Sequence, residues 1–121
     1  DFDQVVESFL RSWTDGPHRT PEQVDPAVRE RVRAMARNGI EHAMEGRMLN
    51  PPAVERLDQL ETPMLVVVGE LDDPGILEIA GLLVAADPKA ELVTVPGVAH
   101  MVNLEAPDRF NEVLLGFLDR F

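Results

Sequence analysis

Two short turns in the second half of the sequence carry residues suited to acid–base chemistry. Asp72 lies in the turn after an apolar run at residues 64–68, and His100 lies in the turn after a second run at residues 92–95. A histidine can take up and return a proton near neutral pH. A carboxylate bonded to its other ring nitrogen fixes the tautomer and stabilises the imidazolium. In this chain order the pair matches the last two members of a Ser…Asp…His triad, so Asp72 and His100 are the candidate catalytic acid and base.

The nucleophile of such a triad is not evident in the sequence. The only serines are Ser8 and Ser12, there is no cysteine, and no Gly-x-Ser-x-Gly turn occurs. Because the covalent step needs an activated nucleophile, we expect the nucleophile to lie outside these 121 residues and this chain to be inactive alone. The opening at Asp1, already inside an amphipathic pattern, predicts that the chain is a piece of a longer polypeptide.

A strand–helix–strand–helix series is expected to position the two turns. The continuous apolar run at residues 64–68 predicts a strand buried on both faces. Residues 76–86 predict a helix, residues 91–95 a strand nearer a sheet edge, and Ala106-Pro107 the start of a last helix with a strong apolar face. A strand–helix–strand unit implies parallel pairing with a right-handed crossover. Both turns should therefore meet at one edge of the sheet, where open α/β sheets bind ligands.

The first sixty residues are polar and helical in period. Apolar residues recur at spacings of three and four from Phe2 to Trp13, and Asp15-Gly16-Pro17 should end that helix. Asp25-Pro26 predicts the start of a second helix, with an N-cap and a proline at the first helical position. Asn38-Gly39 is a candidate break or kink in it. Residues 53–60 predict one short further helix.

Residues 62–121 resemble the α/β-hydrolase family through two motifs. Thr62-Pro63, an apolar strand and Gly69-x-x-Asp72 are similar to the family's acid turn, and Pro96-Gly97-Val98-Ala99-His100 with the following Glu105-Ala106-Pro107 is similar to its histidine turn. The resemblance implies an α/β fold. A helical lid region at residues 1–60 would precede a β-α-β-α unit at residues 61–121, which forms the C-terminal part of a parallel sheet.

The resemblance also implies a reaction and roles for these residues. The reaction would be hydrolysis of an ester, lactone or C–C bond by a Ser-His-Asp triad, with Asp72 as the acid and His100 as the base. Glu105 would only help to start the last helix. Pro74 follows the acid sooner than is usual in the family, which leaves Asp73 as a rival to Asp72, although Asp72 is favoured.

Composition limits the partners and cofactors. Twenty-two acidic residues against eleven basic ones give a net charge of −11, which argues against nucleic acid and anionic membranes as partners. The absence of cysteine fits a cytoplasmic protein, and no apolar run approaches the roughly 20 residues of a membrane span. We expect a small ester- or lactone-like substrate, no cofactor and no metal, since nothing joins His42 and Glu45, three residues apart, as a further ligand.

Other chemically capable residues have simpler structural interpretations. Asp73 fits an N-cap of the next helix, and His18 and His42 are expected to face solvent. The only basic cluster is the segment Arg29-Glu30-Arg31 together with Arg33 and Arg37. We expect it to be a solvated helix face whose positive charge is balanced by Glu30 and Glu41. Four residues of the lid region are expected to pack helices more often than they line a substrate: Trp13, Met35, Met44 and Met48. Met101 and Val102, next to the histidine, either shape a substrate pocket or do not, and the sequence favours neither.

The alternative to a hydrolase fragment is a non-catalytic module that acts through dimerisation or partner binding. Two parallel strands with unpaired edges and a helix with one apolar face would favour association, either of two copies or with an N-terminal half. A stable symmetric dimer that ignores such a half would support this alternative.

Overall fold

The computed structural model of the 121-residue chain describes residues 1–42 and 50–121. Its first part is helical. Helix α1 (Phe2–Leu10) continues into a π-helical turn (Arg11–Asp15), and a short 3-10 turn (Pro21–Gln23) leads to helix α2 (Pro26–Glu41). The predicted start of α2 is confirmed, because the Asp25 side chain accepts a hydrogen bond from the Ala27 amide at 2.8 Å. The helix continues through Asn38-Gly39 without the break considered from the sequence.

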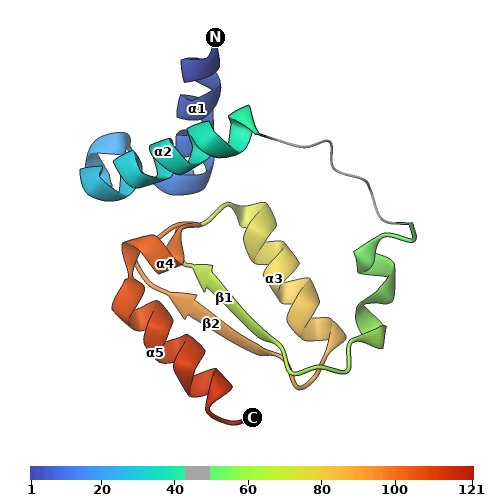
Figure 1. Ribbon diagram of the computed structural model, residues 1–121. Helices are drawn as coiled ribbons and strands as arrows, with labels where there is room; N and C mark the ends of the chain where they lie inside the picture. Colours follow the sequence, from blue (N-terminus) through green and yellow to red (C-terminus); the bar gives the residue numbers. More distant parts are fainter. Residues whose placement is uncertain (43–49) are drawn as a thin grey trace.

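The second part is a two-stranded parallel sheet with helices beside it. Strand β1 (Leu65–Gly69) pairs with β2 (Glu91–Val95), in a register from Leu65 opposite Glu91 to Gly69 opposite Val95. Helix α3 (Pro74–Ala86) connects the strands, while α4 (Val102–Glu105) and α5 (Pro107–Leu118) follow β2. Figure 1 shows α3 and α5 on opposite sides of the sheet, and α1 with α2 beyond the arrowhead ends of the strands. The expected parallel β-α-β-α unit is thus confirmed.

Three details differ from the sequence-based predictions. Residues 53–60 form not one helix but 3-10 turns (Ala53–Gln59), interrupted where Arg56 takes a non-helical φ of −132°. Helix α4 was not predicted, because four residues are too few to show a helical period. Residues 65–67 of β1 are only half-buried rather than buried on both faces, since β2 is the strand's only neighbour in the described sheet. The predictions for Met44, Glu45 and Met48 fall outside the described residues.

Two apolar clusters hold these elements. The first joins α1 to α2 and consists of Val6, Leu10, Val32 and Ala36, with Met101 and Leu104 packed against it. The second lies under α5 and consists of Val95, Val98 and Val102, with neighbours that include Val67 and Phe110. Because Met101 and Val102 are consecutive and belong to different clusters, the segment after His100 connects the helical part to the sheet. Within the described ranges, no helix combines the length and hydrophobicity of a bilayer-spanning segment.

Candidate active site

The two predicted turns lie side by side at the ends of the strands. The Glu70 amide donates to the Val95 carbonyl and the Leu71 amide donates to the Val98 carbonyl, both at 2.9 Å. Gly69 makes this approach possible, because a Cβ atom there would lie 2.1 Å from the Ala99 carbonyl oxygen. Parallel strands thus bring together two turns that are separated by a whole helix in the sequence.

Asp72 and His100 are in direct contact. The Nδ1 atom of His100 lies 2.8 Å from Oδ2 of Asp72, whose second oxygen accepts the Asp73 amide at 2.8 Å. Asp72 is only 2% exposed, whereas the His100 side chain is 39% exposed. With the carboxylate as acceptor, Nδ1 carries the proton, so Nε2 of the neutral ring has a free lone pair. No hydrogen bond from the described residues occupies Nε2, which can therefore take a proton from outside.

The structure separates the roles of the two adjacent aspartates. Asp73 does not meet His100. Its Oδ1 instead accepts the Gly75 amide at 2.8 Å and caps helix α3. The expected capping role of Asp73 is therefore confirmed, and Asp72 is the carboxylate that the fold brings to the histidine.

Trp13 lies against the histidine, which the sequence did not predict. Its ring centroid is 4.9 Å from that of His100, with an interplanar angle of 54°. Trp13 also lies 6.5 Å from the Phe9 ring. The wider π-helical turn Arg11–Asp15 carries it, and Gly16 ends that turn with φ of +75°. The prediction that Trp13 packs between helices is thus incomplete, because its indole also lies against the imidazole of His100.

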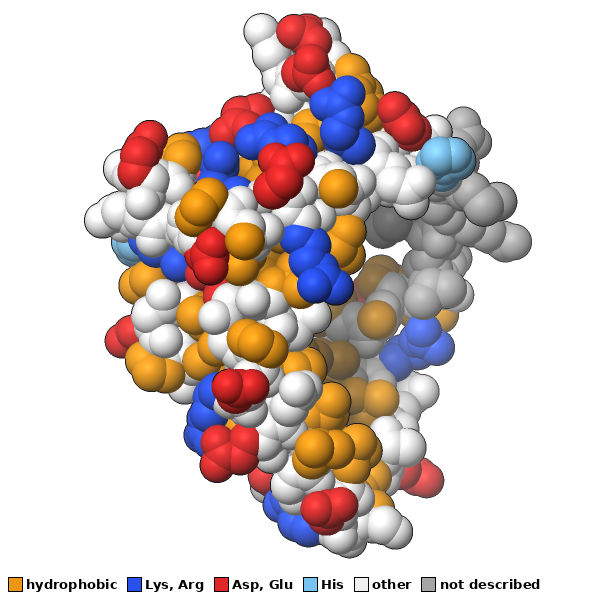
Figure 2. Space-filling view, turned by 60° about the vertical axis from the view of Figure 1, so that its left-hand side comes forward, with side chains coloured by type: hydrophobic (Ala, Val, Ile, Leu, Met, Phe, Trp, Pro, Cys, Tyr) orange, Lys and Arg blue, Asp and Glu red, His pale blue; other side chains and the backbone are white. Residues whose placement is uncertain are grey.

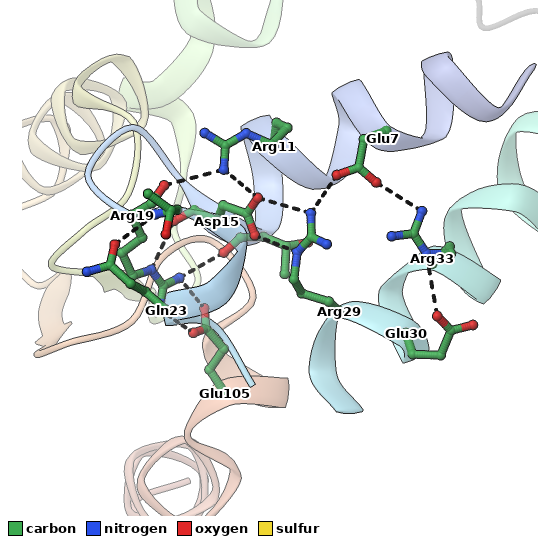
Figure 3. A network of polar contacts seen from close by, with 11 residues as sticks. Glu7, Arg11, Asp15, Arg19, Gln23, Arg29, Glu30, Arg33 and Glu105 are labelled. Atoms are coloured by element: carbon green, nitrogen blue, oxygen red, sulfur yellow. Dashed lines mark hydrogen bonds and ion pairs between the residues drawn. The ribbon is translucent and has the colours of Figure 1, made fainter. Parts of the chain in front are cut away.

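A network of charged side chains connects the helical part to the histidine turn (Figure 3). Asp15 is fully buried and accepts hydrogen bonds from Arg11 and Arg29, while Arg29 also binds Glu7. The hydrogen bonds that Arg29 donates to Asp15 raise the pKa of Arg29, and burial lowers it by less, so the net effect is a raised pKa. The hydrogen bond from Arg29 is the main cause that lowers the pKa of Glu7.

The interpretation of the basic cluster as a solvated helix face is correct only in part: Arg31 and Arg37 are exposed, but Arg29 is largely buried. Arg29 and Arg33 both bind Glu7 of α1, and Arg37 pairs with Asp3, so these arginines join two helices. Figure 2 shows the basic and acidic side chains interleaved over this end of the molecule. A second correction concerns Glu105, expected only to start the last helix. It ends α4, and its carboxylate binds Arg19 and the Ala99 amide.

An apolar hollow of about 280 Å³ opens beside the histidine segment. Its lining comes from α1, α2 and the segment after His100: Phe9, Val32, Met35, Ala36, Gly39, Ile40, Met101 and Leu104. Met35 is more than half exposed at this hollow, and Met101 faces it. Met35 was expected to pack helices, but more than half of it is exposed and lines this hollow instead.

The remaining candidates lie away from His100. His18 and His42 are exposed, as expected, and His42 Nδ1 lies 2.8 Å from the Asn38 carbonyl. Ser8 and Ser12 line a shallow hollow with Glu7 and Arg11 rather than with His100. Across residues 1–42 and 50–121, no three His, Asp or Glu side chains are grouped closely enough to hold a metal ion.

Comparison with known proteins identifies the family of this chain. Residues 2–113 match the model of a family described as "Alpha/beta hydrolase family". A search of curated protein sequences finds no match.

Solved structures give the same result for the fold. A thermophilic esterase is 26% identical with a TM-score of 0.74, over 98% of this chain and 46% of that one. A hydrolase from Pseudomonas aeruginosa PA01 is 29% identical with a TM-score of 0.71, over 98% of this chain and 44% of that one. A bromoperoxidase from Bacillus anthracis shares the fold, at 21% identity and a TM-score of 0.71, over 96% of this chain and 43% of that one. The chain spans less than half the length of each of these three proteins. The resemblance inferred from the acid and histidine turns is confirmed: the chain belongs to the alpha/beta hydrolase family.

Proposed function

We propose that this chain supplies the acid Asp72 and the base His100 of a Ser-His-Asp hydrolase whose serine nucleophile lies outside these 121 residues. One observation carries the proposal: the Nδ1···Oδ2 contact of 2.8 Å, with Nε2 left free on a half-exposed ring at the ends of two parallel strands. The buried carboxylate supports it, because a desolvated acid holds the ring orientation and favours the imidazolium.

The proposed reaction follows from this geometry. A serine Oγ attacks the carbonyl carbon of an ester and gives its proton to Nε2 of His100, while Asp72 stabilises the imidazolium. The imidazolium then protonates the leaving alcohol, and an acyl-enzyme remains. A water molecule releases the acid by the same proton transfers in reverse. Ester hydrolysis is the first choice because a related structure at 26% identity is an esterase, and lactone or C–C bond hydrolysis would use the same groups.

We further propose that residues 1–60 are the lid region and residues 61–121 belong to the hydrolase core. The position of α1 and α2 beyond the strand ends supports this division (Figure 1), and so does the contact of Trp13 with His100. The apolar hollow next to Met101 fits the hydrocarbon part of a small substrate. The net charge of −11 disfavours nucleic acid and anionic membranes as partners, and the absence of cysteine fits a cytoplasmic location.

Ester turnover tests the proposal. The intact polypeptide, as its organism produces it (the source polypeptide), is assayed for hydrolysis of p-nitrophenyl acetate and butyrate. A fluorophosphonate probe labels the nucleophile, and peptide mass spectrometry identifies the labelled residue. His100→Ala and Asp72→Asn should each lower kcat by about 10⁴-fold, the scale seen when a triad member or the correct tautomer is lost. Asp73→Asn is the matched control and should leave kcat within about twofold, because asparagine also caps helices. Turnover that survives His100→Ala would overturn the proposal.

A non-catalytic module is the second candidate, and exposed apolar side chains favour it. Residues of α3 and of the C-terminal segment are each more than half exposed: Ile79, Leu82, Leu115, Leu118 and Phe121. Exposed apolar surface of this kind is typical of a face that another polypeptide covers. Sedimentation of the source polypeptide distinguishes the candidates: a stable dimer without ester turnover would support association, and a monomer that reacts with fluorophosphonate would exclude it.

A further inference from the structure

We propose that Arg19 and Glu105 are positioning residues. Their ion pair holds together the histidine turn at residues 96–100 (the His100 turn) and the π-helical turn Arg11–Asp15 (the Trp13 turn). The imidazole thereby keeps its place between Asp72 and Trp13. The inference rests on the proposed role of His100 as the base. It adds two residues that neither contact the ring nor belong to the triad.

Glu105 holds the backbone immediately before the histidine. Its Oε1 accepts the Ala99 amide at 3.1 Å and Arg19 Nη2 at 3.0 Å, and its Oε2 accepts Arg19 Nη1 at 2.6 Å. The carboxylate is only 8% exposed, and Ala99 is fully buried. A charged acceptor shielded from water binds an amide more strongly than a neutral one does. The position of the His100 backbone therefore depends on this carboxylate.

Arg19 holds both turns with a single guanidinium group. Its Nε donates to the Asp15 carbonyl at 2.9 Å, and its Nη2 donates to the Thr14 carbonyl at 2.8 Å. Its Nη1 also reaches the Gly97 carbonyl at 3.4 Å. Together with the two bonds to Glu105, all five N–H donors of the side chain are used. Figure 3 shows the Arg19 side chain near Asp15 and paired with Glu105. Thr14 follows Trp13 directly, so this planar group fixes the distance between the Trp13 turn and the His100 turn.

The geometry of Arg19 favours positioning over a simple contribution to stability. Buried ion pairs are often no more stabilising than the apolar residues that could replace them. What a guanidinium adds is direction, since its donors have fixed angles that a lysine ammonium cannot reproduce. Here those directions lead to the backbone on both sides of the imidazole. Loss of the pair should therefore loosen the site more than it loosens the rest of the fold.

NMR of the ¹⁵N-labelled source polypeptide tests this directly. The readouts are the nuclear Overhauser effect between the Trp13 indole and the His100 imidazole, and hydrogen exchange at the Ala99 amide relative to the Val32 amide in α2. In Glu105→Ala, Ala99 exchange should rise by roughly 10- to 100-fold over that of Val32, the factor for losing a hydrogen bond to a charged group. The indole–imidazole effect should weaken. Arg19→Lys should weaken it too, because one ammonium cannot hold both turns.

Conservative and distant variants separate positioning from general destabilisation. Glu105→Gln keeps an oxygen that can accept the Ala99 amide, so it should restore Ala99 protection but not the indole–imidazole contact. Glu112→Gln is the matched control, because Glu112 is exposed and pairs only with Arg109 of the same helix. The inference is overturned if the exchange rates of the Ala99 and Val32 amides rise equally in Glu105→Ala. It is also overturned if both readouts stay at wild-type values in Arg19→Lys and Glu105→Gln.

The NMR readouts do not depend on hydrolysis, so they can fail or succeed separately from the proposed function. If the polypeptide hydrolyses esters, Arg19→Lys should also lower kcat by roughly 10- to 100-fold with KM little changed, as misplacement of a catalytic group does. A change confined to KM would contradict positioning. Loss of the indole–imidazole contact in a polypeptide without ester turnover would support the positioning role while the proposed function fails.

Discussion

The imidazole of His100 and the indole of Trp13 lie 4.9 Å apart between ring centroids, at an interplanar angle of 54°. The two residues come from opposite ends of the chain. Asp72 holds the Nδ1 edge of the imidazole, and the indole covers part of its surface. The helical part of the molecule thus contributes to the surroundings of the candidate base as well as lying beyond the strand ends.

We expect the fluorescence of Trp13 to report on His100. Trp13 is the only tryptophan of these 121 residues, so the emission of the 121-residue chain comes from this site alone. His100→Ala should expose the indole to water and shift its emission maximum to longer wavelength. His42→Ala should leave the spectrum unchanged, because His42 is exposed and its ring bonds to the Asn38 carbonyl. Identical spectra for wild type and His100→Ala would mean that the two rings do not touch in solution.

Gly69 is expected to tolerate no side chain. A Cβ atom would lie 2.1 Å from the Ala99 carbonyl oxygen and 2.4 Å from that of Val98. Gly69→Ala must therefore separate the acid turn from the histidine turn, and it should lower the free energy of unfolding by about 1–3 kcal/mol or more. Urea unfolding followed by circular dichroism measures this change.

Gly81→Ala is the matched control for Gly69→Ala. Gly81 lies in α3, and a Cβ atom there meets nothing within 4 Å. Its replacement should stabilise the protein by about 0.5–1 kcal/mol, since alanine loses less conformational entropy in a helix than glycine. Similar unfolding midpoints for the two variants would contradict the close approach of the turns.

Asp73 should matter for stability rather than for catalysis. Asp73→Ala removes the cap that accepts the Gly75 amide, and it should cost about 0.5–2 kcal/mol in the free energy of unfolding. The Asp73 amide still donates to Asp72, so ester turnover should stay near the wild-type value. A large loss of kcat in Asp73→Ala at a temperature where the protein is folded would restore Asp73 as the candidate acid.

Glu7 should make a pH-dependent contribution to stability. The hydrogen bond from Arg29 lowers the pKa of Glu7 below its ordinary value of 4.5, and Arg33 adds to this. A carboxylate with a lowered pKa in the folded state stabilises fully above the ordinary value, and it loses this effect as the pH falls through the folded-state value. Because the Glu7 side chain is 42% exposed, the contribution should stay below about 1 kcal/mol.

Comparison of wild type with Glu7→Gln measures this contribution. The difference in free energy of unfolding should be constant from pH 7 to about pH 5, and it should shrink as the pH falls below about 4.5. Added salt should reduce the difference at pH 7, because solvent ions screen an exposed pair. A difference that is equal at pH 7 and pH 3 would show that the Glu7 charge is not its cause.

The local signals in the sequence were sufficient for the strands, the caps and the order of the turns. Proline and aspartate mark the starts of α2 and α3, and the apolar runs mark β1 and β2. These features depend on residues a few positions apart, so their spacing is visible in the chain. Short pieces such as α4 were missed because four residues cannot display a period.

By itself, the sequence determined the family, the parallel β-α-β-α unit and the two turns that hold Asp72 and His100. Only the tertiary structure decided that Asp72 rather than Asp73 meets the imidazole, that Trp13 covers it, and that Arg19 joins Glu105. Charge and residue type do not say whether a side chain meets water or a distant partner. That choice depends on which backbone segments pack side by side, and therefore on the whole fold.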